Sequence, residues 1–243
     1  PELIESARAL DPGNALYPYL AARRVLGIMR PSTTTDWGEA PGTTGTPQES
    51  WRRDHDVDGA ILLIDTKKTE EDAPPPPPRY EVLDRERLDR AMVLVEEGLV
   101  TEARRTYQMD MLKERLGIMG PPKRMFGVVQ RIATSASVLL PSLGYQRDLM
   151  RASIAYGDLL LREGDAARAA RFLGAWETMS HQLLEEADGI FIEVLMAGAI
   201  IELGNEAAAV YRRAGMDEEA DRMEARVTAA AGPVRDWRAA RSA

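Results

Sequence analysis

The stretch Leu161–Trp176, LREGDAARAARFLGAW, places Gly164 between two segments whose apolar residues recur at helical spacing. Glycine allows the left-handed backbone conformation through which a chain leaves a helix. The alanines that follow are small, so a returning helix can approach the preceding one closely. The stretch therefore predicts two antiparallel helices joined by a tight turn at Gly164.

A similar pattern recurs around three other glycines. Around Gly164 a small residue lies seven positions before, an apolar residue four before, an alanine five after and an apolar residue nine after. All four positions are kept around Gly98, and the first three are kept around Gly204 and Gly215. The residues are Gly157, Leu160, Ala169 and Leu173 for Gly164; Ala91, Leu94, Ala103 and Tyr107 for Gly98; Ala197, Ile200 and Ala209 for Gly204; and Ala208, Tyr211 and Ala220 for Gly215. The recurrence predicts an all-α array of antiparallel helical hairpins that turn at these glycines.

The opening segment carries a complementary half of this pattern. Ile4, Ala7 and Pro12 have the spacing of an apolar residue, an alanine and a closing proline in a second helix. Together with the glycine spacing, this half of the pattern makes the chain resemble the tetratricopeptide repeat. The resemblance covers residues 1–26, 85–110 and 150–180, and more loosely 190–230. Trp176 and His181 depart from it, because that repeat has a small residue and a closing proline there. The resemblance implies a stack of helical pairs that binds a protein or peptide.

The beginning of the chain suggests further sequence upstream. PELIESARAL looks like the second helix of a unit whose first helix is absent. We therefore expect more repeats or a membrane anchor before Pro1. The Ala- and Arg-rich layout is also similar in style to bacterial repeat proteins that a preceding segment tethers to a membrane.

The composition divides the chain into four parts. Residues 1–30 form a helical hairpin, 31–79 an insertion rich in Pro, Thr and Gly, 80–231 a helical repeat domain and 232–243 a disordered tail. Within the insertion, the β-branched run at 59–68 and the run at 79–84 are expected to pair as a β-hairpin. Pro74–Pro78 is expected to act as a stiff spacer. Helix breaks are expected at Pro141 and Gly232.

Bulk properties exclude several classes of function. The net charge of −8 argues against nucleic acid as a partner, because binding phosphates needs a cationic surface. No cysteine is present, which excludes disulfides and thiolate metal sites. The most apolar run, Gly189–Ile201, contains Glu193 and is shorter than the roughly 20 residues that span a bilayer. We expect it to be a buried helix and expect no transmembrane segment here.

Few residues are candidates for chemistry. His55 lies between Asp54 and Asp56, a combination that could hold a divalent metal, but adjacent loop residues rarely converge on one ion. His181 has Glu177 and Glu185 four residues to either side, which a surface ladder of hydrogen bonds explains more simply. Neither a G-x-S-x-G motif nor a phosphate-binding loop is present. We therefore expect no catalytic, cofactor-binding or metal-binding residues.

Three functions remain open from the sequence. The leading hypothesis is a non-catalytic scaffold that mediates protein–protein interaction. One alternative is a structural subunit of a membrane-associated assembly, and another is an enzyme or metal-binding protein that uses His55 or His181. Some tetratricopeptide domains hold a peptide carboxylate with Asn and Lys, but this chain has only Asn14 and Asn205, both at expected turns. Arginines, such as the adjacent pair Arg212 and Arg213, and apolar residues would have to bind a partner instead.

Overall fold

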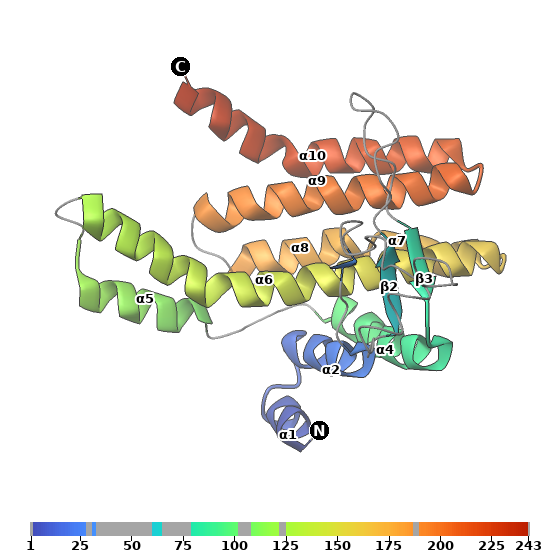
Figure 1. The fold of residues 1–243 in the computed structure, drawn as a ribbon, viewed down its shortest axis with the longest axis horizontal. Coiled ribbons are helices and arrows are strands. Elements are labelled where there is room, and N and C mark those ends of the chain that lie inside the picture. Colours follow the sequence, from blue (N-terminus) through green and yellow to red (C-terminus); the bar gives the residue numbers. More distant parts are fainter. Residues whose placement is uncertain are drawn as a thin grey trace, which may run out of the picture.

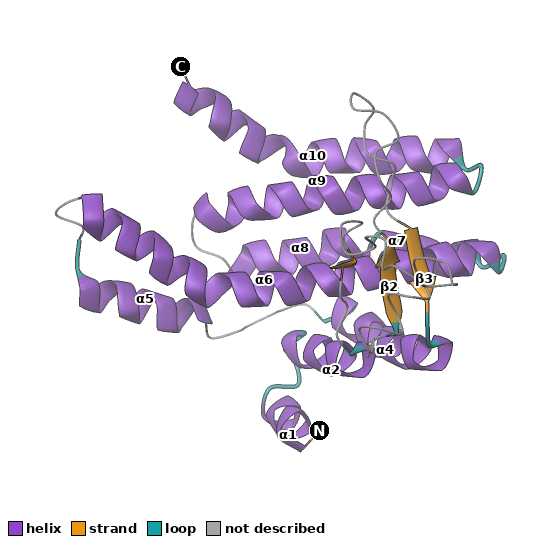
Figure 2. Ribbon diagram, in the orientation of Figure 1, coloured by secondary structure: helices purple, strands orange, loops and turns teal. Residues whose placement is uncertain are grey.

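The computed structural model describes residues 2–27, 31–32, 60–64, 79–101, 108–121, 125–186 and 190–242. Nine helices and three short strands lie within these ranges, so the all-α fold predicted from the sequence is confirmed (Figures 1 and 2). None of the helices in these ranges combines the length and the apolar character needed to cross a bilayer.

The helices vary widely in length. They are α1 (Glu2–Leu10), α2 (Leu16–Leu26), α4 (Arg85–Leu99), α5 (Gln108–Met119), α6 (Met125–Arg162), α7 (Ala166–Leu173), α8 (Ala175–Glu186), α9 (Ile190–Arg213) and α10 (Asp217–Ser242). The strands are β1 (Pro31–Ser32), β2 (Ile61–Ile64) and β3 (Arg79–Val82).

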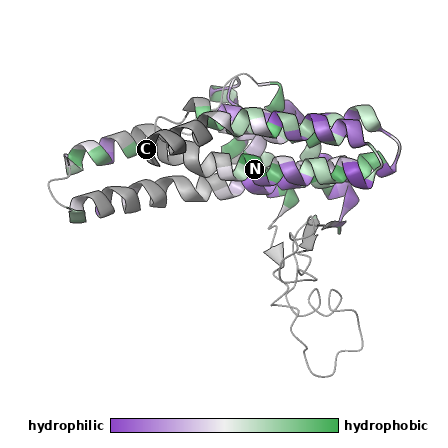
Figure 3. Ribbon diagram, turned by 90° about the horizontal axis from the view of Figure 1, so that it is seen from above, coloured by the Kyte–Doolittle hydropathy of each residue, from purple (hydrophilic) through white to green (hydrophobic). Residues whose placement is uncertain are grey.

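Three helical pairs make up the body of the molecule (Figure 1). The first is α2 with α4, and the third is α9 with α10. In the second, the C-terminal part of α6 pairs with α7 and with α8, which follows α7 after the single residue Gly174. The second and third pairs turn at Gly164 and Gly215, whose φ angles are 85° and 73°. Helix α6 also contacts α2 and α4, and α9 contacts α6 and α8, so the pairs stack in chain order. Figure 3 shows hydrophobic and hydrophilic residues along the same helices, as one-sided packing requires.

In each pair, one buried glycine lies directly against a side chain of the other helix. An added Cβ at Gly98 of α4 would meet the ring of Tyr19 on α2 at under 3.0 Å. The same is true of Gly157 of α6 against Leu173 of α7, and of Gly204 of α9 against Val227 of α10. A missing side chain at these three positions is therefore what lets the paired helices come so close.

One of the four expected turns is wrong, and another is only partly right. Gly204 lies inside α9, whereas α4 does end at Leu99, one residue after Gly98; both glycines are buried, and neither is among the glycines with positive φ. Helix α4 pairs with α2, which precedes the insertion, instead of folding back on α5. The glycine spacing cannot show which role a glycine has. A glycine that leaves room for a neighbouring side chain and a glycine that ends a helix are the same letter in the sequence.

Two proline-containing breaks are also wrong. Helix α6 continues through Pro141, and α10 continues through Gly232 and Pro233 to Ser242, so the tail predicted at 232–243 is helical as far as it is described. Figure 1 shows that both helices change direction along their length. An interior proline removes one backbone hydrogen bond and bends a helix, but the bonds on either side can carry the helix onward.

The insertion contains the predicted β-hairpin. β2 and β3 are antiparallel, with Ile61 opposite Val82 and Ile64 opposite Arg79. β1 extends the sheet by pairing in parallel with β2, which the sequence did not indicate. The domain boundary predicted between residues 79 and 80 falls inside β3. The proline tract and His55 lie outside the described residues.

The join between α1 and α2 is the tight turn that the sequence predicts. Helix α2 begins at Leu16, and the Asn14 side chain accepts a hydrogen bond from the Leu16 backbone N–H at 3.0 Å. The Asn14 amide also donates to Asp11 at 2.9 Å, which fixes the turn. Asn14 thus satisfies a backbone group at the start of α2, as an N-terminal cap would.

Candidate functional site

Most of the predicted repeat positions contribute to the packed core. The buried positions are Ala91, Gly98, Gly157, Leu160, Ala169, Leu173 and Gly204. The half-buried positions are Ala7, Leu94 and Ala209, and the exposed ones are Pro12 and Gly164. Ala197 lies in α9, but its side chain is outside the described part, as are Ala103 and Tyr107. These residues hold the helices together and form no polar site.

Trp176, which departs from the repeat pattern, is accommodated by a neighbouring glycine. Its side chain is 0% exposed. A Cβ at Gly204 would lie 3.3 Å from Cζ2 of Trp176, so the missing side chain on α9 makes room for the indole of α8. A large residue on one helix is thus offset by a small one on the next.

A buried polar network joins the sheet to the helical pairs. Tyr80 of β3 donates a hydrogen bond from its hydroxyl group to Oε2 of Glu206 on α9. The guanidinium group of Arg151 on α6 lies 3.6 Å from Glu206 and 2.5 Å from Glu202. Because Tyr80 and Glu206 are both less than 10% exposed, this network anchors the sheet on α6 and α9.

Burial controls the protonation of this network. Removal from water raises the pKa of Glu206, although the Tyr80 hydroxyl group and Arg151 act in the opposite direction. Burial, with the nearby Glu206 carboxylate, raises the pKa of Tyr80 well above its usual value. Tyr80 therefore remains a hydrogen-bond donor at neutral pH.

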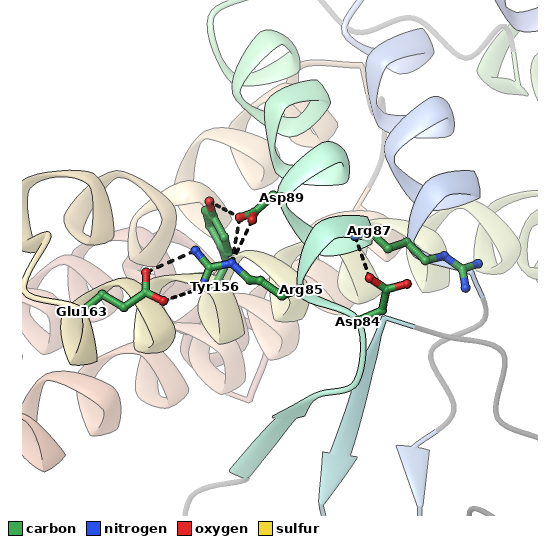
Figure 4. A network of polar contacts seen from close by, with 6 residues as sticks. All are labelled: Asp84, Arg85, Arg87, Asp89, Tyr156 and Glu163. Carbon is green, nitrogen blue, oxygen red and sulfur yellow. Dashed lines mark hydrogen bonds and ion pairs between the residues drawn. The ribbon is translucent and has the colours of Figure 1, made fainter.

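A second polar network connects the start of α4 to α6 (Figure 4). The Arg85 side chain pairs with Asp89 on its own helix and with Glu163 at the end of α6. Tyr156 of α6 donates from its hydroxyl group to Asp89 at 2.7 Å, and burial with this bond raises its pKa to about 12. Asp84 caps α4 by accepting from the backbone N–H of Arg87 at 2.9 Å. The pairing of these groups with one another suits a structural connection between helices.

The best candidate for a binding site is a cavity where β3 meets the ends of α6 and α9. It has a volume of about 480 Å³ and is lined by Tyr80, Asp158, Leu161, Arg162, Arg213 and Ala214. We call it the arginine cavity. Arg162 and Arg213 both approach the carboxylate of Asp158, Arg213 at 3.9 Å. Their side chains are 61% and 31% exposed, so their guanidinium groups remain accessible to a ligand.

A second cavity, of about 520 Å³, lies between α8, α9 and α10 and includes His181 in its wall. Glu177, which the sequence placed beside His181, pairs with Arg226 across this cavity. Among the described residues, no group of three or more His, Cys, Asp or Glu side chains could hold a metal ion. The geometry around His181 therefore gives no support to a metal site.

Comparison with known proteins adds no identification. No protein-family model, no curated protein and no solved structure matches this chain. The arrangement of residues in the arginine cavity is the remaining evidence about function. Of its six lining residues, only Arg213 had been singled out from the sequence, as part of the pair Arg212 and Arg213.

Proposed function

We propose that this protein is a non-catalytic helical scaffold that binds an acidic segment of a partner protein at the arginine cavity. The observation that carries the proposal is the composition of that cavity, in which two guanidinium groups from different helices share one carboxylate, Asp158. A carboxylate from a partner can form charge-assisted hydrogen bonds with both arginines.

The remaining walls suit a peptide better than a free ion. Leu161 and Ala214 supply apolar surface beside the arginines, and Tyr80 borders the cavity from the sheet. A cavity of this size accepts a side chain and its neighbouring backbone. An acidic residue flanked by an apolar residue is thus the expected bound motif.

The stack of helical pairs supports the proposed relationship to tetratricopeptide repeats. Stacked pairs offer a partner a rigid surface built from several helices, as repeat scaffolds do. Arginines, rather than the Asn and Lys side chains of the carboxylate-binding repeat domains, would hold the acidic group here.

Photo-crosslinking in cells tests this function. A benzoylphenylalanine at Ala214, in the cavity wall, should crosslink a discrete partner, whereas one at Ala225, an exposed alanine of α10, should not. Arg213→Glu should abolish the crosslink from position 214. Arg222→Glu is the matched control, because Arg222 is exposed and pairs with Glu219 on its own helix.

Two results of this experiment would contradict the proposal. Equal crosslinking from positions 214 and 225, or a crosslink that survives Arg213→Glu, would rule out recognition at the arginine cavity. Identification of the crosslinked peptide by mass spectrometry should show an acidic residue near the attachment point.

A further inference from the structure

A helical arm projects from the stack of pairs (Figure 1). It consists of α5 and the N-terminal part of α6, up to residue 140. Helix α5 packs on α6, and the hydroxyl group of Thr134 lies 3.7 Å from the sulfur of Met119. The end of the arm, where α5 stops and α6 starts, lies away from the core that the three pairs share (Figure 1).

The end of the arm exposes large apolar side chains. Ile118 at the end of α5 is 81% exposed, and Met125 and Phe126 at the start of α6 are each 77% exposed. Isolated apolar residues are common on protein surfaces, but three so close to one tip form a local apolar surface. Burial of such side chains is favourable in proportion to the apolar area removed from water.

The arm has the opposite charge to the rest of the chain. The arm, residues 108–140, contains five arginines and lysines and only two acidic residues, Asp110 and Glu114, which gives it a net charge of +3. The whole chain has a net charge of −8, so the arm is a basic element in an acidic protein. Arg115 is exposed on α5, three residues before Ile118.

We propose that the end of the arm inserts its apolar side chains into the surface of an anionic lipid bilayer. Exposed apolar residues next to basic ones are what interfacial membrane binding requires, because the former enter the headgroup region and the latter attract anionic lipids. The end of the arm enters the headgroup region without crossing the bilayer.

This inference is independent of the proposed function, because the arm and the arginine cavity share no residues. Membrane attachment through the arm would leave the cavity free for a partner. Loss of one activity therefore does not predict loss of the other.

Vesicle flotation tests the inference on the whole chain. The protein should float with vesicles of phosphatidylcholine and phosphatidylserine, and much less with phosphatidylcholine alone. The double variant Ile118→Ser/Phe126→Ser should bind the anionic vesicles about tenfold more weakly, because two apolar anchors are lost. Arg115→Glu should also weaken binding, and raised salt should weaken that of the wild type.

Matched controls separate insertion from unfolding. Val93→Ser/Val100→Ser changes two apolar residues that are 58% and 80% exposed outside the arm, and it should bind vesicles as the wild type does. Because all four positions are exposed, circular dichroism and the thermal midpoint should change little in either double variant. No flotation of the wild type, or equal flotation of the two double variants, would overturn the inference. Flotation independent of phosphatidylserine would overturn its electrostatic part.

Discussion

Single atoms decide how closely the helices pack. Gly98 lies against the ring of Tyr19, which is 2% exposed, and the Tyr19 hydroxyl group donates to Gln182 of α8 at 2.8 Å. Gln182 in turn donates to the backbone carbonyl of Gly98 at 3.1 Å. The Tyr19 ring is therefore held by its burial and by the hydrogen bond of its hydroxyl group to Gln182. Moving it aside for a new side chain would cost free energy.

Gly98→Ala should lower the free energy of unfolding by about 1–3 kcal/mol, the usual cost of overpacking a rigid site. Gly144→Ala is its control, because a Cβ there meets nothing within 4 Å and α6 is helical at that point. That variant should gain about 0.5–1 kcal/mol through better helix propensity. Urea denaturation measures both. Similar unfolding free energies in the two variants would show that Tyr19 does not hold Gly98 this closely.

The buried carboxyl group of Glu206 should make stability depend on pH. Its pKa is raised in the folded chain, so the folded state keeps this proton to a higher pH than the unfolded state does. The stabilisation is complete below the ordinary glutamate pKa and is lost as pH rises through the raised one. The unfolding free energy of the wild type relative to Glu206→Gln should thus fall with rising pH across this range. A difference that is constant, or that grows with pH, would contradict this.

At the scale of elements, some features could be predicted from local sequence and others could not. The hairpin of β2 and β3 and the turns at Gly164 and Gly215 were predictable, because β-branched runs and glycines between amphipathic segments act locally. The continuation of helices through Pro141 and Pro233 was not, because bonds and packing on either side outweigh the local penalty. The parallel pairing of β1 is a long-range contact that no local signal encodes.

Tyr80→Phe should weaken the attachment of the sheet to the helical stack. It removes the donor from the buried carboxyl group of Glu206, at a cost of about 1–3 kcal/mol. Amide hydrogen exchange in β2 and β3 should therefore become faster. Tyr145→Phe is the control, since Tyr145 is 39% exposed and a phenyl ring still stacks under Arg23, which lies 3.7 Å from the ring centre. Unchanged exchange in Tyr80→Phe would show that apolar contacts alone hold the sheet.

At the scale of the whole molecule, the candidate site is a product of assembly. Its residues come from β3, from the end of α6, and from the end of α9 and the turn after it, so they meet only when the insertion and two helical pairs are in place. The sequence drew attention to Arg213 through its charge alone. It could not show that Asp158 and Arg162 lie beside Arg213, because their separation in sequence exceeds 50 residues.

In each of the three stacked helical pairs, a glycine of one helix lies against a side chain of the other. Nuclear Overhauser effects between the Hα protons of these glycines and the side chains facing them test this arrangement most directly. The structure predicts contacts from Gly98 to the ring of Tyr19, from Gly157 to the methyl groups of Leu173, and from Gly204 to those of Val227. Helical chemical shifts throughout, with none of these three contacts, would mean that the helices form but do not pair as described.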